Sequence, residues 1–386
     1  MGSNHKIEFV NDRLDILEST GLYRRLKTVI PQGPTARVND KEVINLCSND
    51  YLGLSINKTV IKKTIASLRE VSQCSSRLIA GNHPYFSELE DMLASHRRME
   101  SALVYPTGYA ANLGVVMTIA DASSTIYSDE LNHASIVDAC RLSDATVVVF
   151  RHNDMDHLQE LISQREGTKI IITEGVFSMD GDMGKLSEIH ALADRYGAIT
   201  IIDDAHGDFI LGPAFSGTPA ELGVNFDVHI SSMSKALGCF GGYVATTLPI
   251  RELLINASRQ FIYTSALPDH LCSAAIAAIP IAKSGRLQEQ LRSNIVYFSS
   301  ALDRLGFQLR NTSSQIIPLI VGKESDAVKF SNELLGQGVF AQAIRYPTVR
   351  RGQARVRISL SAMHRREHLD YALGAFERTG KKLRII

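Results

Sequence analysis

A lysine set among small polar residues is the first feature of this sequence that could do chemistry. Lys235 lies in the sequence Ser-Ser-Met-Ser-Lys-Ala-Leu-Gly at residues 231–238, directly after the apolar run 228–230. An amine in this position can form an imine with an aldehyde, and the neighbouring hydroxyl and backbone N–H groups can hold a phosphate. Most lysines between serines are solvated surface residues, so this segment alone indicates little.

A carboxylate at the end of another apolar run strengthens the chemical interpretation. Residues 201–206 read Ile-Ile-Asp-Asp-Ala-His, so Asp203 follows a buried run much as Lys235 does. A lysine for the aldehyde and a carboxylate opposite the ring nitrogen are the groups that a pyridoxal phosphate site requires. The alternative role for Asp203 is to cap a helix that follows the strand. The two residues together indicate pyridoxal phosphate as the cofactor.

The bulk composition argues against several other classes of protein. The chain has 386 residues, 45% of them hydrophobic, which is enough for a large core and for two or three domains. Lysine plus arginine and aspartate plus glutamate each number 41, so the charge gives no reason to expect nucleic acid or an anionic membrane as partner. The five scattered cysteines lack metal-ligand spacing, and we expect no metal site and a cytoplasmic location. The basic pairs 97–98 and 350–351 are interpreted as solvated.

Short apolar runs alternate with amphipathic segments between about residues 100 and 247. Seven runs are expected to form strands, at 102–105, 125–127, 146–150, 169–173, 198–202, 228–231 and 243–245. Between them, residues 186–196 show clear helical periodicity. Buried strands that alternate with helices predict a mostly parallel α/β sheet with helices on both faces, which binds ligands beyond the carboxyl ends of its strands. The polar residues at or just past such ends are Ser178, Asp203, His206 and Lys235.

The two ends of the chain follow different patterns. Residues 6 to about 30 have helical periodicity, and residues 37–46 predict a hairpin. From about residue 286 onward the expected elements are a strand at 316–321, a helix at 326–335, a strand at 356–360 and a helix at 367–376. We therefore divide the chain into an N-terminal helix and hairpin segment (1–47), a large cofactor-binding domain (48–285) and a smaller C-terminal α+β domain (286–386).

Several longer motifs resemble those of a known family. They are Asn-Asp-Tyr-Leu-Gly at 49–53, Thr-Gly-Tyr-Ala-Ala-Asn at 107–112, Asn-His-Ala-Ser-Ile at 132–136, Asp-Asp-Ala-His-Gly at 203–207 and Ser-Lys-Ala-Leu-Gly at 234–238. Together they resemble the α-oxoamine synthases, pyridoxal-phosphate transferases of fold type I that condense an amino acid with an acyl thioester. The resemblance covers nearly the whole chain. It implies a mostly parallel seven-stranded sheet, an acyltransferase activity and a homodimer with its active sites at the subunit interface.

The resemblance also implies a role for each matching residue. Lys235 would hold the cofactor and then act as base at the Cα of the amino acid, while Asp203 would pair with the ring nitrogen. His133 would stack on the ring. His206 and Ser178 would lie beside the phenolic oxygen of the ring. The residues expected around the phosphate are Thr107, Gly108, Tyr109 and Ser232, with Thr264 reaching it from the second subunit.

The expected substrates are an amino acid and an acyl thioester of CoA or acyl carrier protein. Arg357 would hold the carboxylate of the amino acid with its planar guanidinium group, assisted by Asn49, and Arg24 would contact the acyl substrate. The Asp-Asp-Ala-His-Gly form favours the branch of the family that joins L-alanine to a pimeloyl thioester. The alternatives are glycine with acetyl-CoA, or a different acyl thioester.

Some positions depart from the family pattern, among them Gly184-Lys185 in place of a common Ala-Pro pair, and two others bear on the acyl pocket. Phe86 replaces a common histidine and Phe209 a common glycine, and both changes are expected to affect the acyl pocket more than the cofactor chemistry. Rival interpretations are an aminotransferase or decarboxylase of the same fold, or a binding protein that retains the fold without catalysis. The intact Lys235 and Asp203 argue against the last of these.

Overall fold

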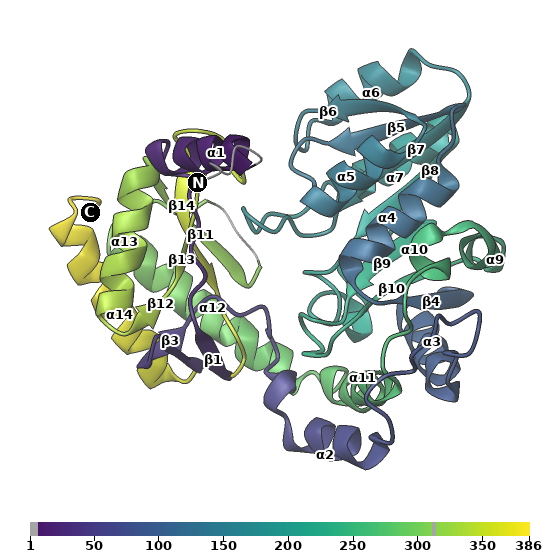
Figure 1. The fold of residues 1–386 in the computed structure, drawn as a ribbon. Helices are drawn as coiled ribbons and strands as arrows, with labels where there is room; N and C mark the ends of the chain where they lie inside the picture. Colours follow the sequence, from purple (N-terminus) through teal and green to yellow (C-terminus); the bar gives the residue numbers. More distant parts are fainter. Residues whose placement is uncertain (1–6, 311–313) are drawn as a thin grey trace, which may run out of the picture.

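The structure, a computed structural model, describes residues 7–310 and 314–386 and shows two bodies that face each other (Figure 1). The larger body is built on a seven-stranded sheet in the order β4-β10-β9-β8-β7-β5-β6. Its strands are β4 (Ser101–Tyr105), β5 (Ser124–Asp129), β6 (Thr146–Phe150), β7 (Thr168–Glu174), β8 (Ala198–Asp203), β9 (Val228–Ser232) and β10 (Gly242–Thr246). Only β10 runs antiparallel to its neighbours in this sheet. The predicted mostly parallel sheet is confirmed, with a strand at each of the seven apolar runs.

Helices cover both faces of this sheet. One face packs against α4 (Gly108–Ile119), α5 (Ala134–Leu142), α9 (Leu248–Ala257) and α10 (Arg259–Ile262). The other packs against α6 (Met155–Ser163) and α7 (Leu186–Tyr196), with α3 (Pro84–Arg97) and α11 (Asp269–Ala282) beside them. The buried residues of α7 are Leu186, Ile189, Leu192 and Ala193, which is the stripe that the helical periodicity predicts. Shorter elements are η2 (Leu54–Ile56), α2 (Lys58–Ser67), η3 (Pro213–Phe215) and α8 (Thr218–Glu221).

The smaller body combines the two ends of the chain (Figure 1). A three-stranded sheet has the order β11-β14-β13, formed by β11 (Ile316–Gly322), β14 (Ala354–Ser359) and β13 (Gln342–Ile344). A second sheet joins β1 (Val29–Gln32), β2 (Thr35–Val38) and β3 (Lys41–Asn45) to β12 (Val339–Phe340), which runs parallel to β3. The long helices of this body are α12 (Arg286–Arg304), α13 (Glu324–Gly336) and α14 (Arg366–Lys382). The N-terminal hairpin is therefore part of the sheet structure of the C-terminal body.

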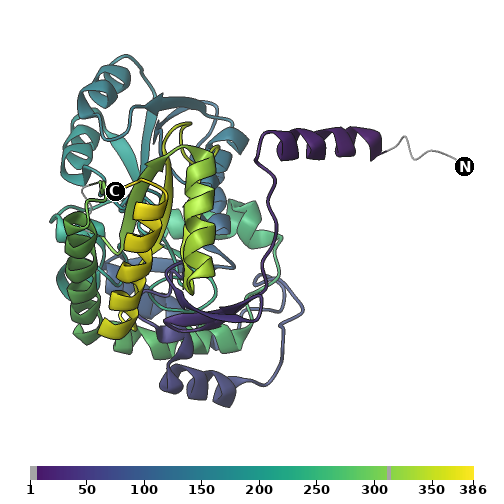
Figure 2. The same cartoon turned by 90° about the vertical axis from the view of Figure 1, so that its left-hand side faces the viewer.

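The N-terminal helix is shorter than its periodicity suggests. Helix α1 (Glu8–Ser19) ends before Gly21, which has a φ of 68°, and the chain then extends into β1. No residue of α1 is buried, and Figure 2 shows the helix standing out from the rest of the molecule. Its apolar stripe therefore does not pack on the core of its own chain. Across the described residues, no helix is both long and apolar enough to cross a membrane.

Candidate active site

A cavity of about 380 Å³ lies between the sheet of the large body and the small body. Its walls contain six of the residues that the sequence assigned to a site: Asn49, His133, Ser178, His206, Lys235 and Arg357. Four of these follow the carboxyl ends of β5, β7, β8 and β9, where ligands bind in parallel sheets. Five further residues line it and were not expected: Cys47, Met179, Phe340, Gln342 and Ile344.

Lys235 begins a chain of hydrogen bonds that crosses the floor of the cavity. Its Nζ lies 3.0 Å from Nε2 of His206, whose Nδ1 lies 2.7 Å from the hydroxyl of Tyr51. Tyr51 in turn donates to Oδ1 of Asn49 at 3.1 Å. Since the tyrosine has one proton, His206 must donate from Nδ1, which leaves Nε2 to accept from Lys235. Tyr51 was missed, although it lies inside the motif at 49–53.

Burial favours the neutral forms of the two titratable groups, Lys235 and His206, that begin this series of hydrogen bonds. Burial lowers the pKa of Lys235, against the opposing charge of Asp203. Burial, with the nearby charge of Lys235, holds the pKa of His206 well below its usual value. A lowered amine pKa raises the fraction of Lys235 that can attack an aldehyde. A neutral His206 can accept a proton from that amine or return one to it.

Asp203 ends β8 and is held by two hydrogen bonds. Its Oδ2 accepts from Nδ2 of Asn112 at 2.6 Å, and its Oδ1 accepts from the backbone N–H of Ala205 at 3.0 Å. Its register partner on β7 is Glu174, a buried carboxyl whose Oε1 has no hydrogen-bond partner among the described residues. Burial and the charge of Asp203 raise the pKa of Glu174 well above its usual value. The neutral form of Glu174 is thereby favoured beside Asp203.

The start of α4 provides an anion site. Thr107 caps the helix by accepting from the backbone N–H of Ala110 at 3.0 Å, and the first N–H groups of a helix lack helical acceptors. The backbone is close on the other side, because a Cβ on Gly242 would lie 2.4 Å from the N of Gly108. The Oγ of Ser232 lies 2.7 Å from that of Ser234. These N–H and hydroxyl groups suit a phosphate.

Pyridoxal phosphate fits the residues present. Lys235 offers the amine, Asp203 the charge for the ring nitrogen, and the α4 terminus a cradle for the phosphate. His133 caps α5 by accepting from the N–H of Ser135 at 3.3 Å and borders the same cavity. The side chain of Tyr109 points elsewhere, since its hydroxyl donates to Asp138, so its expected contribution is the backbone N–H.

Seven of the expected site residues do not border this cavity: Asp203, Thr107, Gly108, Tyr109 and Ser232, described above, and Thr264 and Arg24. Thr264 borders a separate small cavity formed with Arg77, Phe86 and neighbouring residues. Arg24 is exposed and does not border the main cavity. The position of Thr264 accords with a role in a second subunit, and both assignments stay predictions.

The two aromatic departures from the family pattern lie in the core. Phe86 is fully buried, and Cζ of the Arg77 guanidinium lies over its ring, 4.1 Å from the ring centroid. Phe209 has a φ of 59° and stacks on His96 at 3.8 Å. Neither ring lines the main cavity, and the expectation that they affect an acyl pocket stays a prediction. The left-handed backbone at Phe209 costs on the order of 1 kcal/mol, which the stacking offsets in part.

Arg97 is buried, which corrects its interpretation as a solvated residue. Its guanidinium donates to Asp204 at 2.9 Å and to Asp208 at 3.1 Å, and its side chain has no exposed surface. Charge pairing and hydrogen bonds compensate for removing these groups from water. The cluster fixes the backbone that follows Asp203 at the end of β8 and presents His206 to the cavity.

Arg357 is a cation whose described partners are all uncharged. From β14 it donates to the carbonyl oxygen of Ser178 at 2.6 Å, to Oγ of Ser359 at 2.7 Å and to Oδ1 of Asn49 at 3.3 Å. A guanidinium oriented in this way and facing a cavity is suited to a substrate carboxylate.

Replacing Arg357 by lysine should raise KM for the amino acid by roughly 10- to 100-fold. Lysine keeps the charge but loses the planar fork, and a hydrogen bond to a charged group contributes about 1.5–3 kcal/mol. Steady-state kinetics with the amino acid as varied substrate checks this. The same change at the exposed Arg37 is the control, and an unchanged KM in Arg357→Lys would rule out the carboxylate role.

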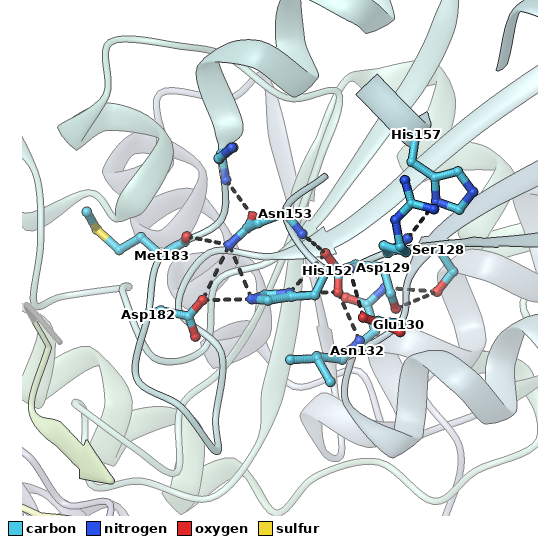
Figure 3. A network of polar contacts seen from close by, with 12 residues as sticks. Ser128, Asp129, Glu130, Asn132, His152, Asn153, His157, Asp182 and Met183 are labelled. Atoms are coloured by element: carbon cyan, nitrogen blue, oxygen red, sulfur yellow. Dashed lines mark hydrogen bonds and ion pairs between the residues drawn. The ribbon is translucent and has the colours of Figure 1, made fainter. Parts of the chain in front are cut away.

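His152 holds the loop that carries Ser178 (Figure 3). Its Nδ1 lies 3.0 Å from Asp129 and its Nε2 2.7 Å from Asp182, while Asn153 donates to the carbonyl oxygen of Met183 at 3.1 Å. Burial opposes the charged form, but the hydrogen bonds and charges of both aspartates outweigh it and raise the pKa of His152 to about 10. The histidine is therefore a cation that ties the loop to the ends of β5 and β6.

This cation predicts a pH-dependent contribution to stability. Because the folded pKa lies above the value of about 6.5 for an unperturbed histidine, the contribution is complete below pH ~6.5 and is lost as the pH rises toward about 10. His152→Gln should lower the free energy of unfolding by about 2 kcal/mol at pH 6. Denaturant melts at pH 6 and pH 10 measure the difference, which should shrink at the higher pH. A difference independent of pH would contradict the charged state.

Comparisons with known proteins agree with the fold and the site. A family model for aminotransferase class I and II matches residues 41–376. The chain is 43% identical to an 8-amino-7-oxononanoate synthase of Thermoanaerobacter pseudethanolicus, over 100% of both chains. The serine palmitoyltransferase of S. paucimobilis, solved with bound PLP, superposes with a TM-score of 0.93 at 27% identity over 100% of both chains. The 8-amino-7-oxononanoate synthase of Francisella tularensis gives 0.77 at 25% identity, over 89% of this chain and 99% of that one.

The fold and site thus define a pyridoxal-phosphate enzyme of fold type I. The chain belongs to the aminotransferase class I and II family and, within it, to the α-oxoamine synthases. The resemblance drawn from the sequence motifs is confirmed, as is the cofactor.

Proposed function

We propose that the protein is an 8-amino-7-oxononanoate synthase, which joins L-alanine to a pimeloyl thioester in biotin synthesis. The observation that carries this is the 43% identity over the full length of a relative with that name. In the proposed reaction the Cα of alanine forms a bond with the thioester carbonyl, the thiol of CoA or acyl carrier protein leaves, and the alanine carboxylate leaves as carbon dioxide. Bound pyridoxal phosphate supplies the electron sink for the Cα carbanion.

The side chains around the cavity support the binding of alanine and the removal of its Cα proton. Arg357 and Asn49 are placed to orient the alanine carboxylate, and Lys235 to remove the Cα proton once its amine has been released. His206, 3.0 Å from Nζ of Lys235, can accept that proton at Nε2, while Tyr51 holds the imidazole in place through Nδ1. His133 and Ser178 border the same cavity, where they would hold the ring from its face and its phenolic side.

The rival substrates are glycine with acetyl-CoA and serine with a longer acyl chain. The amino acids differ only at the substituent on Cα, so they can be compared on one preparation. Adding L-alanine, glycine or L-serine to the holoenzyme should shift the visible absorbance band at the lowest concentration for L-alanine. A response to glycine or serine alone would favour the corresponding rival.

We further propose that the protein is a cytoplasmic homodimer with its active sites at the interface. Thr264 lies away from the cavity of its own chain, and nearby apolar side chains are exposed, Tyr263 by 72% and Ile79 by 82%. Exposed apolar side chains on the segments around Thr264 support this proposal. Sedimentation equilibrium should give twice the mass of 42.4 kDa, and a fully active monomer would contradict the interface.

A further inference from the structure

Part of the cavity lining is apolar. Besides Arg357 and Lys235, Phe340 and Ile344 of the small body line the cavity, and Sγ of Cys47 lies 3.3 Å from the carbonyl oxygen of Phe340. Gln342 is exposed and marks the mouth. An apolar wall of this kind suits methylene groups, so the acyl chain of the thioester belongs against it.

A lysine stands beside this wall with no acidic partner. Lys27 is half-buried, and its Nζ lies 5.4 Å from the ring centroid of Phe340, within the range of a cation–π contact. In the described part of the chain no carboxylate lies within ion-pair distance of it. The charges of Lys27 and Arg357 both act on the thiol of Cys47, which therefore lies near both cations. Burial nevertheless raises the pKa of that thiol to about 12, so Cys47 does not neutralise Lys27.

The segment that carries Lys27 is fixed at this place. Arg345, which follows the wall residue Ile344, donates to the carbonyl oxygens of Gly21 and Tyr23, the latter at 3.1 Å. Arg25 is turned outward and pairs with Glu18 at 3.4 Å. Of the basic residues in this segment, Lys27 is therefore the one held against a residue of the cavity wall.

We propose that Lys27 binds the distal carboxylate of a dicarboxylic acyl chain and so selects a pimeloyl thioester. The proposal rests on the proposed function and adds the residue that determines its acyl specificity. Alanine and a pimeloyl thioester together carry two carboxylates. Two cations without a carboxylate partner among the described residues stand at this place: Arg357 in the cavity lining, and Lys27 against the lining residue Phe340. Acetyl and palmitoyl chains have no distal charge. A site built for a charged group discriminates strongly against an analogue that lacks it.

The test compares two thioesters of equal chain length on the holoenzyme with L-alanine. Pimeloyl-CoA carries the distal carboxylate, and heptanoyl-CoA has a methyl group in its place. Lys27→Met should lower kcat/KM for pimeloyl-CoA by about 10- to 100-fold and leave that for heptanoyl-CoA within about twofold, because a charge-assisted hydrogen bond is lost from one substrate only. Lys27→Arg should retain most of the preference. Lys58→Met, at the exposed start of α2, is the matched control.

Two results would overturn the proposal. An equal loss on both thioesters would place Lys27 at the phosphates of CoA, and no loss on either would remove it from the site. The visible absorbance band and the melting temperature of Lys27→Met establish that it is folded and loaded. If the wild type converts neither thioester, the proposed function fails. The proposal for Lys27 is then tested by calorimetry, which measures the binding of the same two thioesters without turnover. Tighter binding of pimeloyl-CoA that disappears in Lys27→Met supports the proposal, and equal binding overturns it.

Discussion

Replacing Lys235 by alanine should lower kcat by at least about 10⁴-fold. The substitution removes both the amine that holds the cofactor and the base at the Cα of the amino acid, and no second amine borders the cavity in the described residues. The visible absorbance of a lysine-bound pyridoxal group should vanish with the activity. Kinetics and absorbance on the same preparation measure both effects.

The exposed Lys185 provides the control for this change. Lys185→Ala lies at the start of α7 and should retain the activity and absorbance of the wild type. The melting temperature of Lys235→Ala should stay close to that of the cofactor-free wild type, since the cavity wall loses only a flexible side chain. Substantial turnover by Lys235→Ala would refute the role assigned to this residue.

Asp203→Asn should lower kcat by roughly 10²- to 10³-fold while the cofactor stays bound. The amide preserves the shape but removes the charge that stabilises a protonated ring nitrogen, and losses of this size are typical when one preorganised electrostatic group is removed. Lys235 is untouched, so the absorbance band should persist with an altered dependence on pH. Stopped-flow and steady-state kinetics separate this loss of rate from a loss of cofactor.

The register partner of Asp203 is a matched control. Glu174→Gln makes the same chemical change one strand away, but burial and the adjacent carboxylate raise the pKa of Glu174 and so favour its neutral form, which glutamine resembles. Its effect on kcat should therefore stay within about tenfold. If Glu174→Gln lost as much activity as Asp203→Asn, that result would contradict the assignment to Asp203 of the charge that stabilises the ring nitrogen.

The parts of the fold that the sequence predicts best are those governed by local patterns. The strands of the large sheet are buried on both faces, so each appears as an apolar run, and the residues that follow them meet at one edge. This places Asp203, His206 and Lys235 correctly. Strands β12 and β13 have two and three residues and leave no such pattern, although they supply Phe340 and Ile344 to the cavity.

Contacts between distant segments account for the rest of what was missed. Tyr51 contacts His206, which lies 155 residues further along the sequence, and Arg97 contacts Asp204, which lies 107 residues further along. Neither partner is visible in a local window, so a buried arginine and a solvated one look the same in the sequence. Glu174 ends an apolar strand just as Asp203 does, and that shared position was the signal that could have identified it.

The central claim is tested most directly by identifying the product from pimeloyl-CoA and L-alanine. The holoenzyme should release one free thiol and one carbon dioxide for each amino ketone formed, and mass spectrometry should find the mass of 8-amino-7-oxononanoate. Glycine or L-serine in place of alanine should give far less product. Efficient condensation with glycine or serine, and none with L-alanine, would contradict the proposed function and assign the chain to another activity of the same family.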